Sequence, residues 1–191
     1  MKTVNKTNFL EFMKIVKSNK ATIHYIKNWL SKFKLSNISL STQDYNGNTL
    51  LHVAISMKNM KLFNLFIEEN INLDLANYDR KAPIHLAVEI EDTKIVEKLL
   101  EKGANINAPS ETEMTVLHLC VIKGNQKLLK YLVEKGALTS LPDELGLYPL
   151  DYAIDEKNVL MVKYLMNMTP LDEEKESKIK MLLEEKNVRK I

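Results

Sequence analysis

A histidine and a glutamate one helical turn apart are the first residues in this chain whose types and spacing could do chemistry. His85 lies four residues before Glu89 in the segment A-P-I-H-L-A-V-E, whose apolar spacing favours a helix. Residues four apart share a helix face, so the two side chains would be neighbours. Such a pair could begin a metal site, act as an acid–base pair, or serve only the scaffold.

The other residue types that do chemistry have no catalytic motif around them. Cys120 occupies a small-residue position in an apolar run, which favours a core filler over a nucleophile. The phosphate-binding, dinucleotide-binding, C-x-x-C and H-E-x-x-H patterns do not occur. We therefore predict no catalytic, metal or cofactor site and a protein that is not an enzyme. A catalytic or accessory role for Glu89, Glu111 or Cys120 is the disfavoured alternative.

The composition predicts an intracellular, cytoplasmic protein that neither binds nucleic acid nor inserts into a membrane. The 191 residues carry a net charge of +2, with lysine and glutamate interspersed rather than gathered into a basic patch. A single cysteine excludes an internal disulfide framework and fits a reducing compartment. No apolar run reaches the roughly 18 residues of a membrane span, and charges interrupt the N-terminal apolar stretch.

Four segments share one pattern at a fixed period of 33 residues. One position of this pattern is held by His52, His85, His118 and Asp151. Each segment continues into a second apolar-periodic run, such as I-V-E-K-L-L at 95–100. Two of these runs end in Gly-Ala, at Gly103 and Gly136, where a left-handed helix cap suits glycine. The pattern predicts two short helices per repeat.

This pattern resembles the ankyrin repeat, whose signature is T-P-L-H-x-A in a 33-residue unit of one turn and two helices. The four copies here read T-L-L-H from Thr49, A-P-I-H from Ala82, T-V-L-H from Thr115 and Y-P-L-D from Tyr148. The match covers residues 44–170, about two-thirds of the chain. The resemblance implies an all-α fold, an ankyrin-repeat solenoid of stacked helix–turn–helix units with hairpin loops.

The expected organisation is a single ankyrin-repeat domain over residues 1–191. It comprises N-terminal capping helices in 1–43, repeats at 44–76, 77–109, 110–142 and 143–170, and a C-terminal capping helix in 171–191. The capping helices at 8–18 and 21–33 should turn inward Phe9, Phe12, Met13, Val16, Ile23, Ile26, Trp29, Leu30 and Phe33. Thr169 is the expected N-cap of the last helix, with Pro170 in its first turn. Ile179, Leu182 and Leu183 should cover the last repeat.

The signature residues have predictable local roles. Thr49 and Thr115 can cap the first helix of a repeat, and a proline fits its first turn. Helices packed about 8–10 Å apart keep the repeated histidines too distant to share one zinc ion. The resemblance implies instead that each histidine bonds to its own threonine and to backbone near the inter-repeat turn. Ala82 replaces the threonine beside His85, so that copy should be weaker.

Residues that the scaffold does not dictate are the candidates for binding a partner. In ankyrin proteins these are the hairpin tips and the exposed face of the first helices, which line up into one concave face. The candidates at the tips are Tyr45, Asn48, Tyr78, Lys81, Met114, Leu145 and Leu147, and those on the helices are Met57, Glu89, Ile90, Ile122 and Lys123. Many are apolar where the fold tolerates polar residues, as at interfaces; packing against neighbouring hairpins is the alternative. The surrounding acids favour a partner with a basic rim.

The resemblance implies a non-enzymatic module that binds another protein and is monomeric alone. Short stand-alone ankyrin proteins include effectors and inhibitors. The many Lys, Asn and Ile residues are typical of an AT-rich genome, so an effector acting in a host-cell cytoplasm is one expectation. A self-associating scaffold, using the C-terminal helix in 171–186 or the N-terminal cap, is the alternative function.

Overall fold

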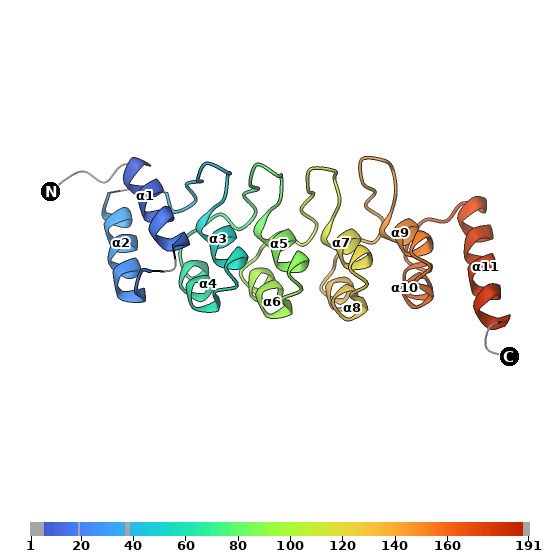
Figure 1. Ribbon diagram of the computed structural model, residues 1–191. Coiled ribbons are helices and arrows are strands. Elements are labelled where there is room, and N and C mark those ends of the chain that lie inside the picture. Colours follow the sequence, from blue (N-terminus) through green and yellow to red (C-terminus); the bar gives the residue numbers. More distant parts are fainter. Residues whose placement is uncertain (1–5, 19, 37–38, 189–191) are drawn as a thin grey trace. The chain divides into compact units, whose positions relative to one another are not determined.

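The computed structural model describes residues 6–18, 20–36 and 39–188, and in these ranges the only regular elements are α-helices joined by turns and hairpin loops (Figure 1). The helices are α1 (Lys6–Lys17), α2 (Ile23–Leu35), α3 (Leu50–Ser56), α4 (Met60–Ile67), α5 (Pro83–Glu89), α6 (Thr93–Glu101), α7 (Val116–Ile122), α8 (Gln126–Glu134), α9 (Pro149–Asp155), α10 (Val159–Leu165) and α11 (Glu173–Val188). Four similar hairpins precede α3, α5, α7 and α9 (Figure 1). The predicted all-α, helix-pair architecture is confirmed.

The first helix of each repeat begins where the signature predicts. Thr49 is the N-cap of α3, and its hydroxyl oxygen accepts a hydrogen bond from the backbone N–H of His52. Pro83 and Pro149 are the first residues of α5 and α9, where a missing N–H removes no helical bond. In the second helices, asparagines such as Asn59 take the capping role through their side-chain oxygen.

Two second helices end in the left-handed conformation predicted from their Gly-Ala pairs. Gly103 has a φ of 91° and Gly136 a φ of 93°. Beyond each glycine the chain turns back, because the N–H of Ala104 donates to the carbonyl of Leu99 at 2.9 Å. After each of these turns the chain continues into the next hairpin.

The chain forms two compact units. Unit 1 comprises Met1–Ala87 and Lys94–Asn105, and unit 2 comprises Val88–Thr93 and Ile106–Ile191. In unit 1, α1 packs against α2 and α3, and a cluster of aromatic rings joins α1 to α2. Phe33 lies 5.2 Å from both Phe9 and Phe12, measured between ring centroids, and all three side chains are fully buried. This cluster closes the first repeat with apolar surface rather than a repeat signature.

In unit 2, α7 packs against α8 and α9, and α11 covers α9 and α10. Ile179 and Leu182 of α11 are buried and Leu183 is partly so, as predicted for a helix that shields the last repeat. A stacked helix pair cannot bury its apolar face alone, so a terminal helix of this kind completes the core.

Two predictions about the capping helices are wrong in detail. Ile23 and Trp29 were expected to point inward with Ile26, Leu30 and Phe33, but they are only half-buried. Trp29 lies at the edge of the aromatic cluster, where it contacts the Phe33 ring and the Lys32 ammonium. Trp29 is therefore a packing residue that keeps some exposed surface.

The last helix begins later than predicted. α11 starts at Glu173, and Asp172 rather than Thr169 caps it, since an Asp172 carboxylate oxygen accepts the Lys175 N–H at 2.8 Å. Pro170 lies in the preceding linker, not in the first helical turn. Thr169 is buried in that linker, and its hydroxyl has no hydrogen-bond partner among the described residues. Residues 166–169 form the turn after α10, so they are not available for the first turn of α11.

Candidate protein-binding surface

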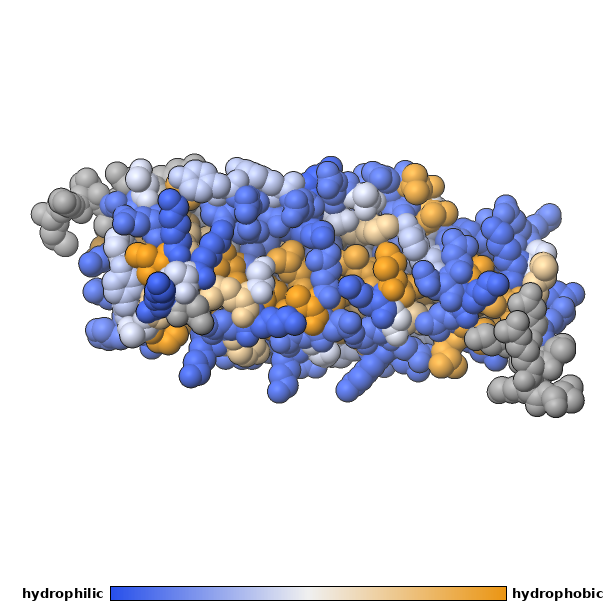
Figure 2. Space-filling model, viewed as in Figure 1, coloured by the Kyte–Doolittle hydropathy of each residue, from blue (hydrophilic) through white to orange (hydrophobic). Residues whose placement is uncertain are grey.

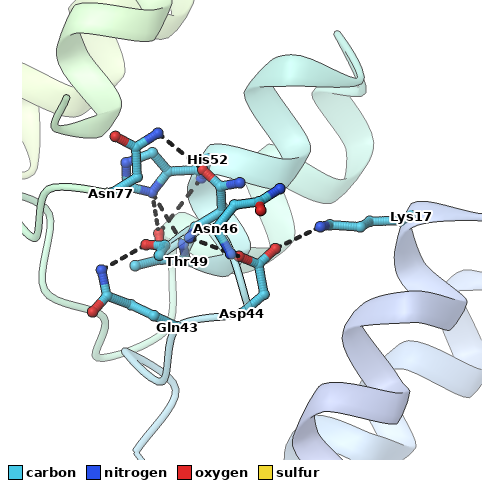
Figure 3. A network of polar contacts seen from close by, with 9 residues as sticks. Lys17, Gln43, Asp44, Asn46, Thr49, His52 and Asn77 are labelled. Atoms are coloured by element: carbon cyan, nitrogen blue, oxygen red, sulfur yellow. Dashed lines mark hydrogen bonds and ion pairs between the residues drawn. The ribbon is translucent and has the colours of Figure 1, made fainter. Parts of the chain in front are cut away.

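The first hairpin is built around the side chain of Asp44 (Figure 3). One carboxylate oxygen accepts the backbone N–H groups of Asn46 at 2.8 Å and Asn48 at 2.9 Å. The other oxygen pairs with the Lys17 ammonium of α1. Burial raises the pKa of this carboxyl group, but the Lys17 and backbone hydrogen bonds outweigh it and leave the pKa below its usual value. Because the turn's polar backbone groups are satisfied internally, Tyr45 projects from a defined loop.

The fourth hairpin repeats this design without the lysine. A carboxylate oxygen of Asp143 accepts the N–H groups of Leu145 at 2.9 Å and Leu147 at 3.0 Å. The Tyr152 hydroxyl donates to the other oxygen at 2.6 Å. Burial alone would raise the pKa of Asp143, but these hydrogen bonds lower it overall. In the second hairpin Asn77 supplies the equivalent oxygen, to the N–H of Lys81.

Neighbouring hairpins are joined within each unit by backbone hydrogen bonds. In unit 1 the N–H of Tyr78 donates to the carbonyl of Asn46 at 3.1 Å. In unit 2 the N–H of Glu144 donates to the carbonyl of Thr112 at 3.0 Å. Each pair of tips is therefore a fixed surface, and not two independent loops.

The repeated histidines hold these hairpins to the helices. Nδ1 of His52 accepts the Thr49 N–H at 3.1 Å, so the proton resides on Nε2, which donates to the carbonyl of Lys81 at 2.8 Å. Nε2 of His118 reaches the carbonyl of Leu147 at 3.1 Å in the same way. Burial lowers the pKa of both rings, which favours this neutral form. The predicted local bonding of these histidines is confirmed.

His85 and Asp151 fill the same position with different partners. Nδ1 of His85 accepts the Ala82 N–H at 3.1 Å, so the missing threonine hydroxyl does not abolish this bond. A carboxylate oxygen of Asp151 accepts the Tyr148 N–H at 2.7 Å and lies 3.2 Å from the Lys175 ammonium of α11. His52 and His118 therefore bond to the hairpin of the next repeat, whereas Asp151 in the last repeat forms an ion pair with the terminal helix α11.

Two tyrosines are the most exposed of the predicted binding residues of unit 1. Tyr45 is 71% exposed and Tyr78 is 69% exposed, at equivalent positions of adjacent hairpins. Gly47 allows the first hairpin to lie close against Tyr78, because a Cβ atom at this residue would lie 2.6 Å from the ring and the backbone N of Tyr78. Asn48, Met57 and Lys81, the other candidates of this unit, are half-buried, and the Asn48 side chain accepts a hydrogen bond from Asn77.

A cavity of about 490 Å³ opens beside these tyrosines. Its walls include Leu10 of α1, Ser41, Thr42 and Gln43 of the segment before the hairpin, and both tyrosine rings. Lys14 of α1 is not part of this lining, but its ammonium lies 6.0 Å from the centroid of the Tyr45 ring. The repeat pattern did not point to Leu10, Lys14 or Gln43, because they precede the first signature and no motif in the sequence marks them.

In unit 2 the structure divides the candidates by exposure. Leu145 is 74% exposed, Ile122 is 44% exposed, and Lys123 is exposed as well. The half-buried candidates are Glu89, Ile90, Met114 and Leu147. Apolar side chains are visible at the tip of the hairpin before α9 (Figure 2). The fourth hairpin and the end of α7 therefore carry the most accessible apolar surface among these residues.

The one cysteine considered for chemistry lies in the core. Cys120 is fully buried, and burial, with a smaller contribution from Glu91, raises the pKa of its thiol to about 12. A thiol held neutral in this way is a poor nucleophile. Among the described residues no three His, Cys, Asp or Glu side chains lie close enough to hold a metal ion.

Sequence comparison assigns the chain to a family. A model of ankyrin repeats in three copies matches residues 12–110 and 107–179, so the chain belongs to the ankyrin repeat family. Repeats of this family are generally protein–protein interaction modules and are typically non-catalytic. A search of curated proteins found no match. None of the helices within the described ranges has both the length and the apolarity needed to span a bilayer.

Proposed function

We propose that this chain is a non-enzymatic binding module that engages a partner protein through its hairpin tips and the ends of its first helices. The observation that carries the proposal is the display of Tyr45, Tyr78 and Leu145 as large, exposed side chains on turns whose backbone groups are already bonded. In this proposal the repeats form one domain with a concave binding face, as the family resemblance implies.

Binding at these tips would gain free energy from buried apolar surface and lose little by ordering the chain. Tyrosine is enriched among the residues that dominate binding energy, because it buries a large ring with few rotatable bonds. A partner that covers these side chains does not have to order the hairpins, since hydrogen bonds such as Tyr78 N–H to Asn46 already do so. The chain would act as an inhibitor or effector by occupying its partner's surface, as a monomer in a cytoplasm.

The charge of the tips suggests which residues the partner offers to unit 2. Glu111, Glu113 and Glu144 are exposed on the third and fourth hairpins, and no basic residue accompanies them there. Basic residues on the partner would speed association and fix its orientation on this surface.

The test is a quantitative binding comparison with a purified partner. Tyr78→Ala and Leu145→Ala should each weaken binding at least about tenfold, the loss expected for an interface hot spot. Leu160→Ala is the matched control, because Leu160 is 63% exposed, similar to the tip residues, but lies on the second helix α10. Unchanged affinity in both tip variants, with helicity intact, rules out the assigned surface.

Self-association is the second candidate function, and exposed apolar residues near the C-terminal helix favour it. Leu160, Met168, Leu171 and Met181 are all exposed around α10 and α11 of unit 2. Apolar surface of this kind often covers another copy of a chain. Light scattering over a wide concentration range tests it: a mass that stays at 22.0 kDa rules self-association out.

A further inference from the structure

We infer that the cavity beside Tyr45 and Tyr78 is a pocket for an apolar side chain from an extended segment of the partner that carries an adjacent carboxylate. The inference rests on the proposed protein-binding function and adds the chemistry of the bound segment. It also adds the capping helix α1 to the binding surface, through Leu10 and Lys14.

The cavity has the size of a ligand site and a lining that suits an apolar side chain together with part of the segment that carries it. Its volume of about 490 Å³ falls within the ~300–1,000 Å³ range of ligand sites. Leu10 and the two tyrosine rings supply apolar walls, and Ser41 and Thr42 supply hydroxyl groups. Apolar walls with a few polar groups suit a leucine-, proline- or phenylalanine-sized group whose backbone remains hydrated.

The walls of the cavity are held in place before any partner arrives. The side-chain amide of Gln43 donates to the carbonyls of Gly47 and Ala76, which ties the segment before the first hairpin to both hairpins. The Ser41 hydroxyl oxygen accepts the Asn72 N–H at 2.8 Å. The Tyr78 ring lies against Gly47, where no side chain could fit. A pocket formed by bonded walls binds without a large ordering cost.

The charges at the cavity favour an acidic rather than a basic segment. Asp44 lines the cavity, but its carboxylate is buried and neutralised by Lys17. Lys14, one turn earlier on α1, is exposed and has no carboxylate within salt-bridge distance among the described residues. A partner carboxylate would pair with Lys14. A partner cation would be repelled by Lys14, whose ammonium already lies over the Tyr45 ring.

The experiment uses the full chain labelled with ¹⁵N and three fluorescent synthetic peptides. The first has leucine and proline flanked by glutamate, the second replaces glutamate with lysine, and the third replaces leucine and proline with serine. We expect only the first to bind in fluorescence anisotropy and to shift the amides of Ser41, Thr42, Tyr45 and Tyr78. Tyr45→Ala should lower its affinity about tenfold or more, as should Lys14→Glu.

Two matched controls keep the result decisive. Lys20→Glu makes the same charge change at an exposed lysine outside the pocket, and Tyr25→Ala removes a tyrosine on α2; neither should change binding. Lys14→Glu should also raise the affinity of the lysine peptide, which a merely unfolded variant cannot do. Equal binding of the glutamate and lysine peptides, or amide shifts that avoid the pocket, overturns the inference.

The two proposals fail in distinguishable ways. If a partner protein loses affinity for Tyr78→Ala and Leu145→Ala but not for Lys14→Glu, the pocket assignment is wrong and the binding surface stands. If no tip substitution affects any partner, the proposed function itself is wrong.

Discussion

A single glycine decides how closely the first two hairpins approach. Gly47 has a φ of 74°, and any Cβ atom there would meet Tyr78, whereas Gly146 has a similar φ of 77° with no atom within 4 Å of a Cβ. Non-glycine residues occupy the equivalent positions in the other two hairpins, Arg80 and Glu113, also at positive φ. The backbone conformation is therefore tolerable, and the contact with Tyr78 is what makes Gly47 necessary.

This difference gives a paired prediction for stability. Gly146→Ala should lower the free energy of unfolding by about 1–2 kcal/mol, the cost of a left-handed alanine. Gly47→Ala should cost more, because the Tyr78 hairpin must also shift. Urea denaturation of the two variants measures the difference. Equal losses would show that the hairpins are not in the contact described.

The buried histidines predict how stability depends on pH. His52 and His118 have lowered pKa values in the folded chain, so above about pH 6.5 both states are neutral and contribute no pH dependence. Below that value the unfolded chain binds protons that the folded chain excludes, and the free energy of unfolding falls with pH until the folded rings titrate.

The pH prediction is tested with His118→Asn. Its amide oxygen can still accept the Thr115 N–H, but it cannot titrate. Between about pH 5 and 6.5 the variant should lose stability less steeply than the parent chain, by at most about 1.4 kcal/mol per pH unit. Asp44 and Asp143, whose pKa values are lowered, act only in more acidic solution. An unchanged slope would mean that His118 is not the neutral, buried ring described.

At the scale of elements, sequence predicts the beginnings of the first helices well and the last helix poorly. Thr49 and Pro83 mark α3 and α5 because each is a cap or first-turn residue inside a repeated pattern. Thr169 and Asp172 are both good N-caps within one turn of chain, and no repeat separates them. In the structure residues 166–169 form the turn after α10, and Asp172 beyond it accepts the Lys175 N–H.

Because α11 starts at Glu173, substitutions of Asp172 and Thr169 should have different effects on stability. Asp172→Ala should cost about 1 kcal/mol, as for other N-caps. Thr169→Val should be neutral or slightly stabilising, because its buried hydroxyl has no partner among the described residues. Thr139→Val is the control, since the Thr139 hydroxyl donates to the carbonyl of Met168. A larger loss of stability for Thr169→Val than for Asp172→Ala would indicate that Thr169, and not Asp172, caps the last helix.

A second element-scale prediction concerns the attachment of α11. Lys175 is largely buried between Asp151 at 3.2 Å and the Tyr148 ring at 4.5 Å. Lys175→Ala should cost roughly 1–2 kcal/mol, because it leaves Asp151 without its cation. Lys178→Ala removes a solvent-exposed pair with Glu174 and should have no measurable effect. Similar thermal shifts for both would mean that α11 does not depend on Asp151.

At the scale of the whole molecule, the 33-residue period predicts the family. It does not reveal the hydrogen bonds made by residues that lie between the signatures. Ser41, Asp74 and Asn107 also recur at this period, and each accepts the backbone N–H of a residue in the following repeat. Their types differ, so no motif marks them. The exposed candidates Tyr45, Tyr78 and Leu145 could be named from register alone, but their exposure and the cavity beside them depend on packing that one sequence does not state.

The most direct test of the central claim is isothermal titration of the full chain with its purified partner, for the parent and a Tyr78→Ala/Leu145→Ala double variant. The account predicts at least a hundredfold loss of affinity in the double variant if the two roughly tenfold effects add, with an unchanged circular dichroism spectrum. Leu160→Ala should bind as the parent does. Parent-like binding by the folded double variant would contradict the claim that the hairpin tips carry the function.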